Sequence, residues 1–526
     1  MKNILFFLFF SSLCFAQFNI IQVNKPISKR PEEVTIAINP KNPNIIAAGA
    51  NINFFYYSLN GGVSWTEKKM SSSLGVWGDP CVVFDADENL YYAHLSNPLQ
   101  GYWIDRIVVQ KSTDNGLTWN DGAGVGYSYP RNQDKEWLAV DVTNSPYRNN
   151  IYMSWTEFDD YGSTNKSDSS RILFSKSSDG AINWSNPIRV SDKSGNCLDS
   201  DSTAEGAVPA IGPNGEIYIA WANAEGIYFD KSLDGGETFG KDKLISDLPG
   251  GWDFDVSGIM RCNGLPITAC DISKSKYRGN IYVLWSDQRN GSTDTDIFLM
   301  KSSDGGESWS QRIRVNDDNT NRHQFFPWMT VDSTSGIIYV VFYDRRNTNG
   351  LDTEVYLARS DDGGETFKNI KISESSFAPN SEVFFGDYTG IAAYKGKVRP
   401  IWMRMDKDAP NSFILSIHTA LINDNDLVTY REEVLDKTPY SFQLFDNYPN
   451  PFNPSTTLGF ELEYPTFISL KVYDPLGREI AMLINEEVKP GVHEVTFHAN
   501  ELSSGVYYYR LSNGKNFITK KMLLLK

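Results

Sequence analysis

The sequence has no basic cluster, few histidines and cysteines, and no long apolar run beyond its first residues. Its 526 residues include 49 Lys or Arg and 65 Asp or Glu, for a formal net charge of −16. A surface of that sign repels phosphate backbones and anionic lipids, so neither nucleic acid nor a membrane surface is expected as a partner. No later segment has the roughly 20 apolar residues of a transmembrane helix, so none is expected.

Metal-binding motifs are missing as well. The five histidines are scattered, and no two cysteines form a CxxC pair, which argues against a zinc site. Acidic loops such as Asp199-Ser-Asp201 leave structural calcium open as an alternative, although their spacing matches no calcium motif. We therefore expect no cofactor.

The first 16 residues have the pattern of a secretory signal peptide. Lys2 supplies the positive charge, Ile4–Phe10 the apolar stretch, and Cys14-Phe15-Ala16 the small-residue cleavage site. A lipoprotein signal at Cys14 is the alternative, but the preceding Ser-Ser-Leu lacks the small residue that such signals use. Cleavage after Ala16 is therefore expected, and the mature chain would begin at Gln17.

One short pattern, S-x-D-x-G-x-(S/T)-(W/F), recurs six times. Its Asp can bond to nearby backbone N–H groups and its Gly permits positive φ, as a β-hairpin turn requires, while the aromatic residue packs between sheets. The copies depart from the pattern at Asn60, Ala181 and Asn183. They are Ser58–Trp65, Ser112–Trp119, Ser177–Trp184, Ser232–Phe239, Ser302–Trp309 and Ser360–Phe367.

A second pattern, an apolar strand, a polar turn and an aromatic-rich strand, occurs seven times at intervals of about 50–70 residues. All-strand repetition at that period predicts four-stranded sheets arranged radially, a β-propeller. The seventh unit lacks the turn motif, and Phe18–Val23 would supply its missing strand, which favours seven blades over six. The seven first strands are Val34–Ile38, Cys81–Phe84, Trp137–Val140, Ala207–Ile211, Leu265–Ala269, Phe326–Val331 and Tyr388–Ala393.

Radial repetition also predicts which residues share a face. The start of each first strand and the end of each second strand lie at one mouth of the central channel. The first set is acidic in five units, at Glu33, Asp79, Glu136, Glu205 and Asp387. The second set includes the arginines Arg289, Arg346 and Arg404. Asp–Arg pairs that only hold the loops together are the alternative to a binding site.

The six turn motifs resemble the Asp-box, or bacterial neuraminidase repeat, of the sialidase family, over roughly Gln17–Ile422. The resemblance implies that Arg289, Arg346 and Arg404 hold a substrate carboxylate through bidentate bonds. It implies Tyr388 as a nucleophile activated by Glu205, and Asp79 as the acid/base. Asp387 and Glu136 would join the arginines in binding substrate. The Arg-Ile-Pro motif of the family is reduced here to Arg30-Pro31.

Two functions follow as alternatives. One is a secreted glycoside hydrolase of the exo-sialidase type that acts on extracellular glycans. The other is a non-catalytic propeller that binds a glycan or protein at the same mouth. The expected partner is an extracellular glycan or glycoprotein, and the chain is expected to be a monomer.

The same repeat register predicts where each cysteine of the mature chain lies. Cys81 and Cys270 fall on inner strands and are expected to be buried thiols. Cys197 and Cys262 both lie in connections at the mouth, so a Cys197–Cys262 disulfide is predicted, in the oxidising setting of an exported protein.

The last segment resembles another family. Asn447–Thr457 (NYPNPFNPSTT), Val472–Glu479 (VYDPLGRE) and Ser504–Leu511 (SGVYYYRL) are similar to motifs of the type A sorting domain of type IX secretion cargo. The resemblance covers Phe442–Lys526 and implies export through the periplasm to the outer surface or medium, with the type IX machinery as a partner. Its alternating strands independently predict a small Ig-like β-sandwich. The polar stretch Asn423–Ser441 would be the linker.

Overall fold

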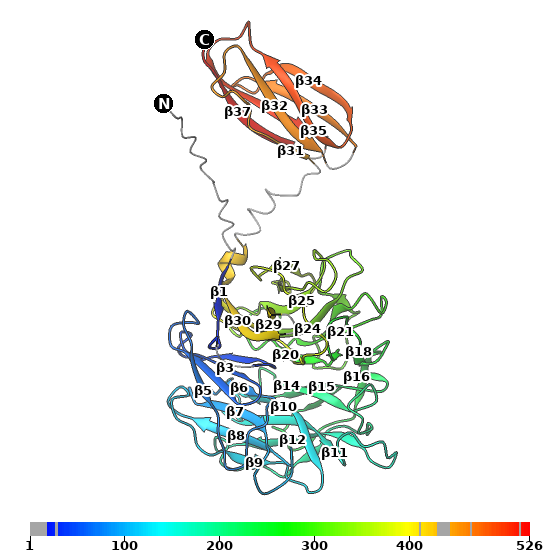
Figure 1. Ribbon diagram of the computed structural model, residues 1–526. Helices are drawn as coiled ribbons and strands as arrows, with labels where there is room; N and C mark the ends of the chain where they lie inside the picture. Colours follow the sequence, from blue (N-terminus) through cyan, green and yellow to red (C-terminus); the bar gives the residue numbers. More distant parts are fainter. Residues whose placement is uncertain (1–17, 27–29, 410–411, 429–441, 463–464, 515–516) are drawn as a thin grey trace. The chain divides into compact units, whose positions relative to one another are not determined.

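The computed structural model describes residues 18–26, 30–409, 412–428, 442–462, 465–514 and 517–526. The signal peptide predicted at Met1–Ala16 and most of the predicted linker lie outside these residues. The chain divides into two compact units, Met1–Leu427 and Val428–Lys526. Apart from one helical turn at 424–428, their regular structure is β (Figure 1).

The N-terminal unit is a β-propeller. Its described strands form seven four-stranded antiparallel sheets. From inner to outer strand, the first four sheets are β2 (Thr35–Ile38), β3 (Ile46–Ala50), β4 (Phe54–Ser58), β5 (Thr66–Lys69); β6 (Cys81–Phe84), β7 (Leu90–Leu95), β8 (Ile107–Ser112), β9 (Ala123–Val125); β10 (Asn132–Val140), β11 (Ile151–Phe158), β12 (Ser170–Ser177), β13 (Ile188–Arg189); β14 (Glu205–Ile211), β15 (Ile217–Asn223), β16 (Gly226–Ser232), β17 (Lys243–Ser246).

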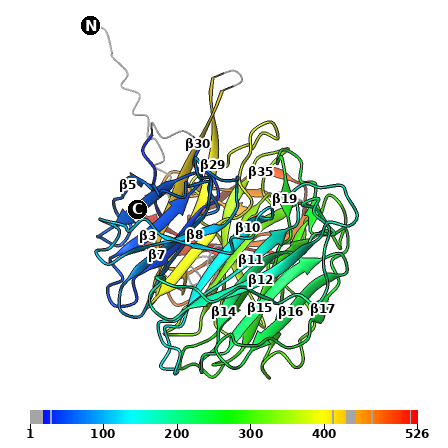
Figure 2. The ribbon, with the colours of Figure 1, turned by 90° about the horizontal axis from the view of Figure 1, so that it is seen from below.

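Three further sheets complete the series, and Figure 2 shows the strands of one sheet, β14 to β17, side by side in order. The last three sheets are β20 (Ile267–Cys270), β21 (Ile281–Asp287), β22 (Asp296–Ser302), β23 (Ile313–Arg314); β24 (Gln324–Val331), β25 (Ile338–Asp344), β26 (Glu354–Ser360), β27 (Lys368–Lys371); β28 (Gly390–Tyr394), β29 (Lys397–Ala409), β30 (Ser412–Asn423), β1 (Asn19–Gln22). A two-stranded ribbon, β18 (Asp253–Phe254) and β19 (Cys262–Asn263), lies between the fourth and fifth.

The ring closes through the two ends of the unit. Strand β1 pairs antiparallel with β30, with Asn19 opposite Leu421 and Gln22 opposite His418 (Figure 1). Each inner strand contacts the inner strand of the next sheet, and β28 contacts β2. The seven inner strands line one central cavity of about 360 Å³.

The second strand of most sheets is buried along its whole length. Its aromatic side chains fill the space between neighbouring sheets, and Trp155, Trp221, Trp285 and Trp402 are among the largest fully buried residues of the protein. Such strands are apolar on both faces because a sheet covers each side. Packing of this kind, repeated around the ring, gives the propeller its core.

The six turn motifs share one hydrogen-bond pattern. At Ser112–Trp119 the Ser112 hydroxyl donates to Asp114 (2.8 Å) and accepts the Gly116 N–H (2.9 Å), while Asp114 accepts the Thr118 N–H at 2.8 Å. The Ser hydroxyl accepts an N–H four residues on in all six motifs. Each motif is a self-contained turn that joins the third and fourth strands of its sheet.

The C-terminal unit is a small β-sandwich. Three strands form one sheet and four the other, and both contribute to a core that includes Leu458, Phe460, Leu470 and Tyr509. The strands are β31 (Phe442–Leu444), β32 (Ser455–Leu462), β35 (Gly491–His498); β34 (Glu479–Val488), β33 (Thr466–Tyr473), β36 (Gly505–Ser512), β37 (Phe517–Leu524). Among the described residues, no helix is long and apolar enough to cross a membrane.

Candidate functional site

The candidate site lies where the inner strands begin. Lys135, Gly206 and Phe326 take left-handed φ values of 55°, 76° and 49° inside the irregular starts of β10, β14 and β24. Glu33 and Asp79, just before β2 and β6, have φ values of 52° and 50°. A bulge changes the regular alternation of side chains along a strand, and the three bulge residues Lys135, Gly206 and Phe326 line one pocket at the channel mouth.

Seven carboxyl groups gather there, and we call them the acidic mouth. They include all five acidic residues that the repeat register predicted to share a face. They are Glu33, Asp79, Asp134, Glu136, Asp199, Glu205 and Asp387. Glu33, Glu136, Glu205 and Asp387 are 3%, 2%, 4% and 5% exposed. The acidic mouth is thus a buried layer rather than an open basin.

Two cations neutralise part of this charge. Arg261, from the loop before β19, bonds both carboxylate oxygens of Asp387 and donates to Asp199 at 2.8 Å. The ammonium of Lys135 lies 3.5 Å from Asp387. Asp387 is therefore the point at which both cations meet the acidic mouth.

The buried carboxyl groups differ in their affinity for protons. Burial raises the pKa of Glu136 well above its usual range, and the charge of Asp79 adds to the effect. Burial likewise raises the pKa of Glu205, with further contributions from Asp199 and Asp134. For Asp387 burial opposes ionisation, but Arg261 and Lys135 lower its pKa below the ordinary value. The acidic mouth thus combines carboxyl groups whose pKa values are raised by burial with one, Asp387, whose pKa is lowered by neighbouring cations.

An aromatic layer closes the channel beneath the acidic mouth. Trp137 and Trp328 have ring centroids 4.4 Å apart, and Tyr388 lies 5.7 Å and 5.6 Å from them. The Lys135 ammonium lies 4.4 Å from the Tyr388 ring centroid. The two indoles line both the central cavity and a pocket of about 30 Å³ at the mouth. That pocket is no larger than one or two water molecules require.

Tyr388 does not have the surroundings that the sialidase resemblance implies. The acids that raise its pKa, after burial itself, are Asp79, Glu33, Glu136 and Asp387. Glu205 faces Asp199 and Asp134 instead, and its Oε2 has no hydrogen-bond partner among the described residues. The expected pair of a tyrosine nucleophile and its activating Glu205 is not formed.

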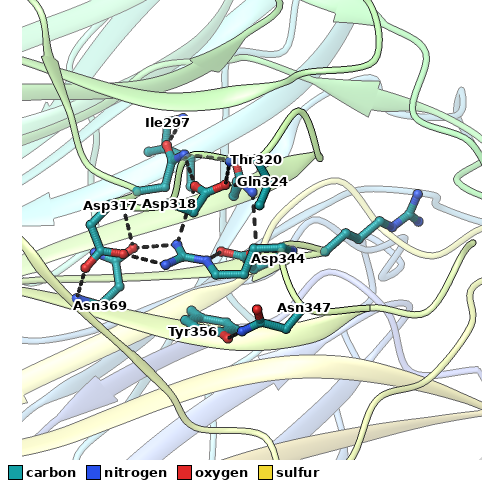
Figure 3. Close-up of polar contacts among 12 residues, drawn as sticks. Ile297, Asp317, Asp318, Thr320, Gln324, Asp344, Asn347, Tyr356 and Asn369 are labelled. Carbon is teal, nitrogen blue, oxygen red and sulfur yellow. Dashed lines mark hydrogen bonds and ion pairs between the residues drawn. The ribbon is translucent and has the colours of Figure 1, made fainter. Parts of the chain in front are cut away.

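The three predicted arginines each have a carboxylate of their own. Arg289 binds Asp287 through Nε at 2.9 Å, and Arg404 binds Asp406 at 2.7 Å. Arg346 binds Asp344 at 2.7 Å and also contacts Asp317. Figure 3 shows Asp317, Asp318 and Asp344 within this network of polar contacts.

Each guanidinium also packs on an aromatic ring of its own surroundings, that of Phe298, Tyr356 or Phe377. None of the three lines the pocket at the mouth. The structure therefore places these arginines within separate blades and does not bring them together. This is the Asp–Arg pairing named above as the alternative.

The predicted Cys197–Cys262 disulfide is wrong, because both residues are free, buried thiols. They lie in different surroundings. Cys197 is near Asp159 and Asp160, where its carbonyl accepts the Gly162 N–H, whereas Cys262 lies in β19. Cys81 and Cys270 are buried free thiols, as expected.

A thiol titration of the chain from Gln17 onward should show these four cysteines directly. We expect almost no reaction with a thiol reagent under native conditions, because burial raises the pKa of Cys81, Cys197, Cys262 and Cys270. After denaturation without reductant, all four should react at once. A yield of only two thiols would contradict the structure, and mass mapping would then identify the bonded pair.

Sequence reasoning missed several residues of this site. Lys135 and Asp134 directly precede the predicted Glu136. All three belong to the site because the strand has a bulge at the start of β10. Arg261 comes from an irregular loop that no repeat predicts. Tyr161 donates to Asp199 at 2.6 Å from a loop after β11. The pattern D-K-E at 134–136 was the only available signal.

Among the described residues, no three His, Cys, Asp or Glu side chains converge on a geometry that could hold a metal ion.

Comparisons with known proteins identify the C-terminal unit. Residues 446–525 match the family described as "Secretion system C-terminal sorting domain". No curated protein matches the chain in sequence. Similar solved structures include a protein of unknown function from Dyadobacter fermentans, with 13% identity, 65% of this chain and 97% of that chain covered, and a TM-score of 0.42.

Two enzymes are also among the similar structures. The Penicillium chrysogenum alpha-L-arabinanase has 12% identity, 66% and 93% coverage, and a TM-score of 0.42. The NanB sialidase from Streptococcus pneumoniae has 10% identity, 75% and 84% coverage, and a TM-score of 0.43.

Proposed function

We propose that this protein, a type IX secretion cargo by its C-terminal sorting domain, binds a glycan at the acidic-mouth face of its propeller and does not hydrolyse it. The sorting domain directs the chain to the cell surface or the medium. The observation that carries the proposal is that Arg289, Arg346 and Arg404 are each neutralised within their own blades. These three arginines therefore do not form a shared cluster of free guanidinium groups for a sialic acid carboxylate, and Arg261 at the mouth is already bound to Asp387 and Asp199.

The burial of the acidic mouth supports the same conclusion. Glu136 and Glu205 are 2% and 4% exposed, and the pocket beside them has a volume of about 30 Å³. Sites for small molecules usually measure about 300–1,000 Å³. A sugar ring cannot reach these carboxyl groups unless the side chains that cover them move.

Ligand contacts remain available at the rim. The side chains of Arg261 and Asp199 are 38% and 14% exposed, and Asp79 and Asp134 are half-buried. Carboxylates accept hydrogen bonds from hydroxyl groups, so such a rim suits a hydroxyl-rich ligand. The negative charge of the mouth disfavours anionic glycans. We therefore infer that the ligand is a neutral glycan.

Binding and turnover can be separated by one pair of assays. The purified chain should bind at least one neutral glycan on a panel, and it should release no fluorophore from a sialoside. Glu205→Gln should leave binding unchanged, since Glu205 is shielded from the rim. Sialoside turnover that is abolished by Glu205→Gln or by Arg346→Ala, with the fold intact, would overturn the proposal.

One observation favours a hydrolase as the second candidate. Both Glu205 and Asp387 belong to the acidic mouth, where burial raises the pKa of Glu205 and two cations lower that of Asp387. A glycosidase uses two carboxyl groups with opposite shifts of this kind. This function would require the mouth to open for substrate. A panel of neutral aryl glycosides tests it, because turnover would fall as pH rises through the pKa of the acid.

A further inference from the structure

Five large aromatic side chains lie exposed on the same face of the propeller. Trp77, Tyr102, Trp103, Tyr127 and Tyr129 are 39%, 54%, 41%, 56% and 55% exposed, and we call them the aromatic platform. They come from three loops. The loop between β5 and β6 joins the first and second sheets, the loop between β7 and β8 lies within the second, and the loop between β9 and β10 joins the second and third. Exposed apolar surface of this extent usually marks a binding site.

The platform rings are ordered relative to one another. Tyr102 and Tyr129 have centroids 4.4 Å apart, and their hydroxyl groups are joined at 3.0 Å. Trp77 meets Trp103 edge to face at 6.4 Å. The guanidinium of Arg106 covers one face of Tyr127 at 4.3 Å. Four of the rings thus form two contacting pairs, and Tyr127 packs against Arg106.

Backbone and amide contacts fix these loops. The Trp103 carbonyl accepts the Asn132 side-chain amide at 3.1 Å, and the Ile104 carbonyl accepts the Gln133 N–H at 2.8 Å. The side chain of Ile104 is itself fully buried. A platform held in place before binding loses little conformational entropy when a ligand arrives.

The platform is connected to the acidic mouth. Trp103 meets Tyr161 edge to face at 5.4 Å, and the Tyr161 hydroxyl donates to Asp199. These contacts place the aromatic platform next to a carboxylate of the acidic mouth. A sugar ring presents C–H groups on its faces and hydroxyls on its edges. The C–H groups suit the negative face of an aromatic ring, and the hydroxyls suit the carboxylates and the paired tyrosine hydroxyls.

We propose that the aromatic platform binds the chain of a neutral polysaccharide, with sugar rings stacked on Trp103 and on the Tyr102–Tyr129 pair. This proposal rests on the glycan-binding function proposed above and names its site and ligand class. The seven carboxyl groups of the mouth and the net charge of −16 disfavour an anionic polysaccharide. Stacking on several separate rings favours an extended chain over a single sugar.

The test measures binding of the full chain from Gln17 onward to insoluble cellulose, xylan and mannan, with polygalacturonate as the anionic comparison. We expect one neutral polysaccharide to retain the protein. Trp103→Ala and Tyr129→Ala should each weaken that binding on the order of tenfold, and Trp103→Phe should restore most of it. Tyr448→Ala removes an exposed aromatic residue of the C-terminal unit and is the matched control, with no expected loss.

The outcomes distinguish failure of the platform proposal from failure of the proposed glycan-binding function. If no polysaccharide or panel glycan binds the unaltered chain, both proposals fail. If a glycan binds and Trp103→Ala binds equally well while keeping its melting temperature, only the platform proposal fails. Preferential binding to polygalacturonate would overturn the neutral ligand class. A change from dimer to monomer on Trp103→Ala would show that a second copy of the chain occupies the platform instead.

Discussion

Replacing Lys135 with methionine should destabilise the propeller by about 3–5 kcal/mol at pH 7.5, the cost of removing one partner from a buried ion pair. The Lys135 side chain is 17% exposed and lies 3.5 Å from Asp387, which is 5% exposed. Its charge also lowers the pKa of Glu33, Glu136 and Glu205. Without it, several buried carboxylates lose a compensating charge together. Urea unfolding followed by tryptophan fluorescence measures the change.

The stability lost on Lys135→Met also depends on pH. The pKa of Lys135 is raised by Asp387, Asp79 and Glu33 against the effect of burial. Its stabilising charge is therefore fully present below its ordinary pKa of about 10.4. The pKa of Asp387, the carboxylate that acts most strongly on Lys135, is lowered by Arg261 and Lys135, so the loss caused by Lys135→Met should persist as pH falls to about 5. A loss that disappears between pH 7.5 and pH 5 would contradict the pairing of Lys135 with an ionised Asp387.

Two matched variants separate the ion pair from general packing. Glu136→Gln removes a buried carboxyl group whose two oxygens have no hydrogen-bond partner. Because burial raises the pKa of Glu136 in the folded protein, this residue lowers the free energy of unfolding as pH rises above about 4.3. Glu136→Gln should therefore be more stable than the parent at pH 7.5. Lys193→Met breaks an exposed pair with Glu225 at 2.7 Å and should leave the free energy of unfolding nearly unchanged, because solvent screens exposed ion pairs.

Deleting Phe442–Lys526 should stop export to the cell surface and medium while leaving a folded propeller in the periplasm. The C-terminal unit is compact and has its own core, and residues 446–525 match the sorting-domain family. Cell fractionation would locate the truncated protein, and its melting temperature would show whether the propeller is intact. Full-level release of the truncated protein into the medium would contradict the role of the sorting domain.

The repeat made much of the fold predictable. Its period indicated the radial sheets, and aligning the units brought Glu33, Asp79, Glu136, Glu205 and Asp387 to one mouth. These predictions succeed because equivalent positions in a repeated sheet have equivalent places around the axis. The motifs near Asn447 and Val472 likewise identified the C-terminal unit without any structure.

The chemistry of the mouth could not be predicted in the same way. Arg289 and Arg346 are each bound by the aspartate two residues earlier, a local pairing that a resemblance to an enzyme family does not reveal. Arg261 reaches Asp387 from 126 residues away in the sequence. The Cys197–Cys262 prediction failed because a shared face does not bring two residues within the Cα separation of about 4.4–6.8 Å that a disulfide needs.

The pairing of β1 with β30 has a consequence for how the protein is made. Strand β1 is among the first segments of the mature chain to leave the ribosome, and its partner is about 400 residues behind it. Until β30 has been synthesised, the seventh sheet has no place for β1 and the first sheet has no neighbour on that side. An unfinished ring exposes strand edges that can pair with other chains. The propeller can therefore complete its fold only after its last strand is available, which keeps the N-terminal segment unpaired throughout synthesis.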